Sequence, residues 1–179
     1  MLVGNTRTSL TKNATVANTG ACSSGGQKII NGGFESDTAN WTSTPGVIGS
    51  ILGFAHSGSW LAWLDGYGYD HIDDVYQTVS IPANACSATF SFWLKITTDE
   101  ATTKTPYDTM TVTVRNSAGS ILTTLATYSN LNKSAGYELK SFNLTAYKGK
   151  TIRLQFHGVE NFINATNFFV DDVSLIERH

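Results

Sequence analysis

Residues 88–96 have the sequence Ala-Thr-Phe-Ser-Phe-Trp-Leu-Lys-Ile, in which apolar and polar side chains alternate. Successive side chains of a β-strand point to opposite faces of its sheet. One face of this strand would carry Phe90, Phe92, Leu94 and Ile96, and the other Ser91, Trp93 and Lys95. A strand with one apolar and one polar face is typical of an antiparallel sheet that covers a core on one side and meets water on the other.

Similar runs recur along the chain between turn signals. They cover residues 27–31, 60–64, 75–81, 88–96, 109–115, 121–127, 137–144, 151–157 and 168–176. The segment Asn116-Ser117-Ala118-Gly119 predicts a hairpin turn. No segment has a sustained helical period. About nine strands predict an all-β fold, a two-sheet antiparallel jelly-roll β-sandwich.

The length of 179 residues suits one domain with a substantial core. We expect residues 1–27, which are polar and lack aromatics, to be a linker or loosely held segment, and residues 28–177 to form the sandwich. The net charge of -2 provides no attraction for nucleic acid or an anionic membrane. No apolar run is long enough to span a bilayer. We therefore expect neither nucleic-acid nor membrane partners, and we also expect a monomer.

The chain has two cysteines, Cys22 and Cys86. A disulfide between them would fix the N-terminal segment to the sandwich, and the composition suits a secreted protein, in which disulfides persist. The alternative is two unrelated thiols. Residues 1–25 contain no apolar signal-peptide core, so secretion would require a longer precursor.

Two stretches at opposite ends of the chain predict one calcium site. The first is Asn31-Gly32-Gly33-Phe34-Glu35, a glycine turn followed by a carboxylate, and the second is the last strand, with Asp171 and Asp172 in its middle. Carboxylates in a hydrophobic run are costly to bury without a compensating charge. Calcium, which takes about six to eight oxygen ligands, would compensate them and would join the first strand to the last.

Strict alternation along the last strand places Asp171 on one face with Phe169, Val173 and Leu175. If Val173 and Leu175 point inward, Asp171 is the better ligand. Asp172 would then be solvated or hydrogen-bonded to a neighbouring loop. The alternative is that both acids lie at an exposed strand end.

A second group of acids lies on three loops, which a jelly roll could bring to one rim. Our preferred ligands for a second calcium ion are Asp65, Asp73, Glu100 and Asp108. These carboxylates would repel one another unless a cation joined them. The alternative is that they are solvated loop acids.

Trp93 is expected on the polar face of its strand, and an exposed tryptophan there needs an explanation. If residues 151–157 lie beside it, an aromatic platform for a sugar or peptide would be formed by Trp93, Lys95, Arg153, Gln155 and His157. The alternative is that the N-terminal segment or a loop such as 36–58 covers Trp93. Tyr67 and Tyr69, in a glycine-rich loop, are the competing exposed platform.

Several segments, considered together, carry a resemblance to a known fold family. They are Asn31–Glu35, His56–Ser59, residues 88–93 and residues 170–175, and they resemble the galactose-binding-like jelly roll of many carbohydrate-binding modules. More narrowly, residues 62–68, 106–112 and 125–131 resemble C-terminal accessory domains of secreted bacterial peptidases of the kumamolisin and subtilisin types. The resemblance runs from about Ile29 to Leu175.

The resemblance implies a structural calcium between the first and last strands. Its ligands would be the Glu35 carboxylate, an acid of the last strand, and backbone carbonyls near Gly33 and from His56 to Ser59. It also implies a secreted module whose partners are a parent catalytic domain and a polysaccharide or protein substrate.

Enzyme signatures are absent from the sequence, which lacks a Gly-x-Ser-x-Gly elbow, a His-Glu-x-x-His motif, a P-loop and a Cys-x-x-Cys pair. Three non-catalytic functions stay open. The first is a calcium-stabilised accessory module of a secreted hydrolase, in particular a peptidase. The others are a carbohydrate-binding module that uses exposed aromatics and a cell-surface adhesion or structural domain.

Overall fold

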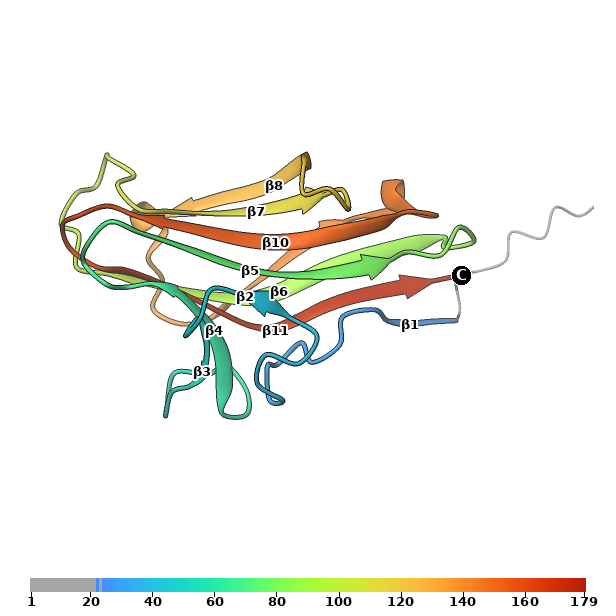
Figure 1. The fold of residues 1–179 in the computed structure, drawn as a ribbon, viewed down its shortest axis with the longest axis horizontal. Coiled ribbons are helices and arrows are strands. Elements are labelled where there is room, and N and C mark those ends of the chain that lie inside the picture. The colour runs from blue at the N-terminus through green and yellow to red at the C-terminus, as the bar shows by residue number, and fades with distance from the viewer. Residues whose placement is uncertain (1–21, 23) are drawn as a thin grey trace, which may run out of the picture.

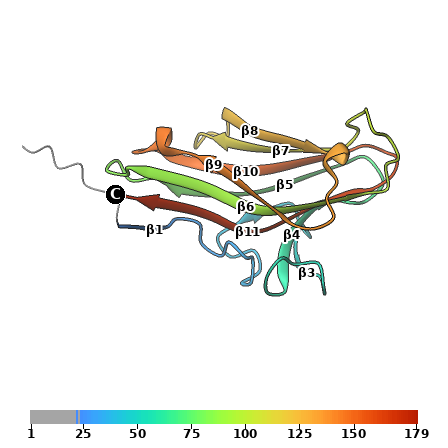
Figure 2. The same cartoon turned by 180° about the vertical axis from the view of Figure 1, so that it is seen from behind.

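The apolar faces predicted from the alternation pack against one another in the computed structural model of the chain, which describes Cys22 and residues 24–179. Two antiparallel sheets form a β-sandwich, seen as stacked layers in Figure 1 and from behind in Figure 2. The helical segments in this described part are the three-residue turns Asn130–Asn132 and Thr145–Tyr147. None is long and apolar enough to cross a membrane.

The first sheet is ordered β3 (Ile48–Ser50), β4 (Trp60–Asp65), β11 (Thr166–Arg178), β6 (Ser87–Thr98) and β9 (Glu138–Asn143), and β1 (Gly25–Gln27) also pairs with β11. The second is ordered β2 (Thr42–Ser43), β5 (His71–Ser80), β10 (Thr151–Glu160), β7 (Thr109–Arg115) and β8 (Ile121–Ser129). The last strand thus pairs with the first, as predicted.

The core lies between the sheets. Phe92 of β6 and Phe156 of β10 are fully buried, and their rings meet edge to face with centroids 4.9 Å apart. Such a contact adds to the free energy gained by burying both rings. The inward face predicted for residues 88–96 is therefore confirmed.

Eight of the nine predicted strands are present at the predicted places. Thr109–Arg115 has the predicted bounds, and the other seven differ from the prediction at one or both ends. The first lies earlier than expected, at Gly25–Gln27, so the sandwich begins inside the segment expected to be a linker. Most of that segment lies outside the described residues. Strands β2 and β3 were not predicted, since two or three residues are too few to show an alternation.

Cys22 and Cys86 form a disulfide, with Cα atoms 6.1 Å apart. Cys86 directly precedes β6, and the backbone N–H of Cys86 donates to the carbonyl oxygen of Arg178 in β11. Of the two alternatives that the sequence left open, the disulfide is correct.

Strand β11 breaks the strict alternation on which we based the orientation of Asp171. Phe168 and Val170 point into the core, and a bulge between Asp171 and Ser174 returns Val173 to the core. Asp171 pairs with Trp93, on the outer face of the sheet. The prediction that Asp171 shares a face with Val173 is therefore wrong, because the extra residue in the bulge changes the register.

Candidate functional site

Asp171 is fully buried although it lies on the outer face, because the loop between β3 and β4 covers it. Its Oδ2 atom accepts hydrogen bonds from the backbone N–H groups of His56 (2.8 Å) and Ser57 (3.1 Å). Its Oδ1 atom accepts one from the N–H of Asp172 (2.7 Å). Burial, together with the charge of Asp172, raises the pKa of Asp171 to about 6 in spite of these bonds.

Glu35 reaches the same loop from the glycine turn. Its Oε1 atom accepts hydrogen bonds from the backbone N–H groups of Ser59 and Trp60, each 2.8 Å long. Gly58 has a φ of +63°, and a Cβ atom there would overlap the Glu35 carboxylate. A Cβ at Gly33 would lie 3.2 Å from Oδ1 of Asp172 and 3.9 Å from Oδ1 of Asp171. The two glycines thus allow the carboxylates to lie close to the backbone.

Asp172 completes the contact between the bulge and the loop. Its Oδ1 atom accepts a hydrogen bond from the Ser57 hydroxyl (2.8 Å), and its Oδ2 atom lies 2.7 Å from Nδ1 of His56. This agrees with the expected hydrogen bonding of Asp172 to a neighbouring loop. The structure therefore brings together the residues predicted for the first calcium site, namely Gly33, Glu35, His56, Ser59, Asp171 and Asp172. We call this group the bulge site.

The donor atoms of the bulge site suit a hard cation, since they are carboxylate oxygens held beside glycines. The loop, however, presents N–H groups to both carboxylates, where carbonyl oxygens were expected. Among the described residues no group of three or more His, Cys, Asp and Glu side chains is spaced to hold a metal ion. A calcium ion here would therefore need backbone carbonyls and water to complete its coordination.

A second group of acids closes the core at the end where three loops meet. The contacts between these loops include hydrogen bonds from Tyr67 N–H to Glu160 (2.8 Å) and from Asn161 N–H to Asp108 (2.9 Å). The N–H of Asp99 also donates to the carbonyl oxygen of Ala165 (2.9 Å). The gathering of these loops at one rim, which the sequence analysis proposed, is thus present.

Four carboxylates at this end are buried, and we call them the core-end cluster: Asp65, Asp73, Asp108 and Glu160. Burial raises the pKa of Asp65 to about 9, and the charges of Asp73, Glu160 and Asp108 contribute to this rise. Three of the four were predicted. Glu100 is buried as well, but Glu160 and not Glu100 adds to the charge around Asp65.

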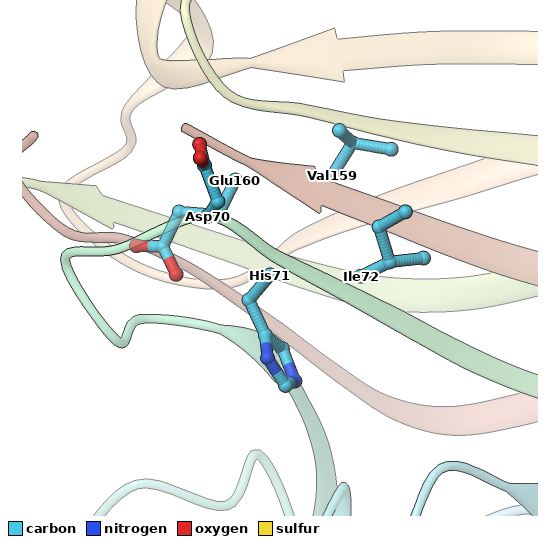
Figure 3. Close-up of a pocket in the computed structure, with 5 residues that line it drawn as sticks. All are labelled: Asp70, His71, Ile72, Val159 and Glu160. Carbon is cyan, nitrogen blue, oxygen red and sulfur yellow. The ribbon is translucent and has the colours of Figure 1, made fainter. Parts of the chain in front are cut away.

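The exposed tyrosines lie above the core-end cluster. Tyr67 and Tyr69 are 40% and 55% exposed, their ring centroids are 5.4 Å apart, and the His71 ring lies 4.0 Å from Tyr67. Beside them is an open depression of about 510 Å³ lined by Asp70, His71, Ile72, Val159 and Glu160 (Figure 3). Ile72 and Val159 of this lining could not be predicted from the sequence, because strand residues at the end of a sheet carry no distinctive sequence signal.

Trp93 does not form the expected platform. The His56 ring stacks on it with centroids 4.0 Å apart, so the alternative that a loop covers this tryptophan is correct. Lys95, two residues along, lies over the Phe54 ring of the same loop.

Strand β10 lies in the other sheet, so the expectation that its polar side chains surround Trp93 is wrong. These side chains form a separate row on the outer face of the second sheet. His157 and Gln155 contact the Asp74 carboxylate, and Arg153 stacks on the Tyr76 ring at 4.0 Å. Burial alone would raise the pKa of Asp74, but the hydrogen bonds from His157 and Gln155 and the charges of His157 and Arg115 together hold it below its usual value.

No protein-family model matches the sequence, and no curated protein is significantly similar to it. Solved structures do share its architecture. The module TmCBM61, solved with β-1,4-galactotriose, superposes with a TM-score of 0.59 at 13% identity over 83% of this chain and 97% of that one.

A family 16 carbohydrate-binding module gives a TM-score of 0.53 at 19% identity, over 82% of this chain and 97% of that one. The K3 adhesin domain of Lys-gingipain from Porphyromonas gingivalis gives 0.55 at 14% identity, over 83% and 98%. At such identities the likeness establishes the fold alone: the chain has the two-sheet β-sandwich found in these carbohydrate-binding and adhesin domains.

Proposed function

We propose that the chain is a non-catalytic carbohydrate-binding module in which Tyr67 and Tyr69 stack on sugar rings. The observation that carries this proposal is the exposed tyrosine pair beside an open, partly polar depression. Two half-exposed aromatic rings that lie side by side offer a surface on which sugar rings can stack. The fold shared with TmCBM61, which was solved with a galactotriose, supports the same class of ligand.

The residues around the tyrosines supply the second requirement of sugar recognition. An aromatic ring packs against the C–H face of a sugar, while polar side chains bond its hydroxyl groups and fix its orientation. Asp70 provides a carboxylate acceptor in the depression, and His71 provides a ring nitrogen. The site is open enough for one or more rings of a longer polysaccharide.

The proposal includes a structural calcium ion in the bulge site. The ion would neutralise Glu35 and Asp171, which both lie near Gly33 and accept hydrogen bonds from the same loop. Its chemistry there would be charge compensation and cross-linking of the glycine turn, the β3–β4 loop and β11, and it would take no part in sugar binding.

The sequence resemblance to accessory domains of secreted bacterial peptidases supports one more element of the proposal. In this view the module is one part of a larger secreted hydrolase. Its partner is the catalytic domain of that hydrolase, which it holds near a polysaccharide or protein substrate. Its place would then be extracellular.

Binding to an array of soluble and insoluble polysaccharides tests the proposed function. We expect the chain to retain at least one polysaccharide, and Tyr67→Ala or Tyr69→Ala to weaken binding about tenfold or more, as for the loss of an aromatic anchor. Tyr69→Phe keeps the ring and should retain most of the affinity. Leu139→Ala is the matched control, because Leu139 is as exposed as Tyr69 but lies on β9. Binding that survives both alanine variants, or binding to no polysaccharide, would reject the proposal.

A further inference from the structure

Three of the four carboxylates in the core-end cluster accept hydrogen bonds from neighbouring groups. Asp73 accepts the backbone N–H of Asp65 at 2.9 Å and lies 3.2 Å from Nε2 of His71. Asp108 accepts the N–H of Asn161 and the hydroxyl of Thr166. Glu160 accepts the N–H groups of Tyr67, Gly68 and Thr166. Each of these carboxylates therefore keeps part of the hydrogen bonding that it would have in water.

Asp65 is the exception. Its side chain is only 2% exposed, and neither carboxylate oxygen has a hydrogen-bond partner among the described residues. A buried polar group without a partner is strongly destabilising, and a buried carboxylate more so. The residue also holds a φ of +61°, which only few non-glycine residues adopt. This geometry directs an unpartnered acid toward three other acids.

The charges near the cluster do not balance. In the described part of the chain, His71 is the only basic side chain that forms an ion pair with any of the four carboxylates. Gly158 of β10 faces Asp65 across the core, and a Cβ atom there would lie 2.6 to 2.8 Å from the Asp65 carboxylate group. The sandwich is thus built to admit this carboxylate, and nothing described beside it carries a compensating charge.

We propose that a divalent cation of the calcium type binds within the core-end cluster, with both oxygens of Asp65 as ligands and Asp73, Asp108 and Glu160 as its carboxylate partners. Calcium accepts carboxylates in one- or two-oxygen contact and fills its coordination with backbone oxygens and water. The four side chains are not already spaced around one point, so they rotate toward the ion as it binds and exchange some of their N–H contacts.

The cation site has a consequence for residues 66–70, the loop that presents Tyr67 and Tyr69, which we call the tyrosine loop. Glu160 holds the backbone of Tyr67 and Gly68, and Asp65 directly precedes this loop. A cation that fixes Asp65 and Glu160 therefore also fixes the start of the segment that presents the tyrosines. This consequence rests on the proposed sugar binding, whereas the cation site itself does not.

Calorimetric titration of the metal-stripped full chain with calcium chloride tests the site, with native mass spectrometry as a count of bound ions. The Asp65→Asn variant should lose one ion per chain, and Asp171→Asn should keep that ion. Asp70→Asn is the matched control, because Asp70 lies on the same loop but outside the cluster, and it should lose none.

Asp65→Asn removes the acid and keeps the shape of the side chain, so the variant should fold. Glu160→Gln provides a second variant, with the same expected loss, should Asp65→Asn not fold. An unchanged ion count in a folded Asp65→Asn or Glu160→Gln variant would overturn the proposal. That result would mean that Asp65 is neutralised by a proton, and it would leave the polysaccharide binding test unaffected.

Discussion

Gly58 lies beside the bulge site at a position with no room for a side chain, because a Cβ atom there would overlap the carboxylate of Glu35. Its backbone is also in the left-handed region, where residues with a Cβ atom are strained. Glycine avoids both the overlap with Glu35 and the backbone strain, because it has a hydrogen atom where alanine has a methyl group. The bulge site therefore depends on a residue that has no functional group.

We expect Gly58→Ala to lower the free energy of unfolding by more than the roughly 1–2 kcal/mol of backbone strain alone, because it also displaces Glu35. Gly53→Ala is the control: Gly53 lies in the same loop with a φ of +78°, but open space surrounds its Cβ position. Urea unfolding of both variants measures the two losses of unfolding free energy. The loss in Gly53→Ala reports backbone strain alone, and the additional loss in Gly58→Ala reports the displacement of Glu35. Equal losses in the two variants would contradict the described contact with Glu35.

The acids of the bulge site could be predicted from the sequence, whereas the loop that binds them could not. Glu35, Asp171 and Asp172 were identified because carboxylates beside apolar residues are costly to bury. The backbone N–H groups of His56 and Ser57 donate to Asp171, which lies 114 or more residues later in the chain. Because almost every residue has a backbone N–H group, no residue type marks these two positions in the sequence. Only the resemblance to known modules indicated that segment.

At the scale of elements, the bulge in β11 explains why Asp171 lies on the outer face of the sheet and not on the core side, where we expected it. Asp171 is buried, as expected, but under the β3–β4 loop and not in the core. Alternation predicts faces for a regular strand, and one added residue reverses them. The sequence has no glycine at the bulge to mark it, and Asp172 adopts the positive φ of 46°.

The bulge joins three elements, so calcium should raise the stability of the whole sandwich. An ion that binds only the folded state at about 100 times its Kd contributes roughly 2.7 kcal/mol. For a chain of this size that is a rise of about 5–10 °C in the melting temperature. Asp171→Asn should remove the share due to the bulge site, whereas Asp37→Asn, an exposed acid near the same turn, should keep the full rise. A full rise in Asp171→Asn would argue against calcium at the bulge.

The disulfide links the segment before β1 to the start of β6, across a separation of 64 residues. In the chain-entropy account, a loop of this length is worth about 4 kcal/mol of unfolding free energy. Reductant should therefore lower the urea midpoint of the native chain. The double variant Cys22→Ser, Cys86→Ser should be less stable and insensitive to reductant. A native chain that is equally stable with and without reductant would show that pairing of β1 with β11 suffices.

At the scale of the whole molecule, the bulge site, proposed to bind a structural calcium ion, and the tyrosines, proposed to bind sugar, lie in different places. The bulge site lies under the β3–β4 loop on the outer face of the first sheet, and the tyrosines lie where three loops close the end of the core. Alternation predicted the sandwich because it depends on local pattern. The pairing of strands distant in sequence, such as β5 with β10, decided which polar residues meet, and no local pattern encodes that pairing.

The central claim is that the tyrosine loop binds a carbohydrate. Amide chemical shifts of the isotope-labelled chain, followed by NMR during titration with an oligosaccharide from the best-retained polysaccharide, test it most directly. We predict the largest shifts at residues 66–72 and 158–161, around the depression, and small shifts at the bulge site. Largest shifts on the polar row of β10, or at the β3–β4 loop above Trp93, would contradict the account.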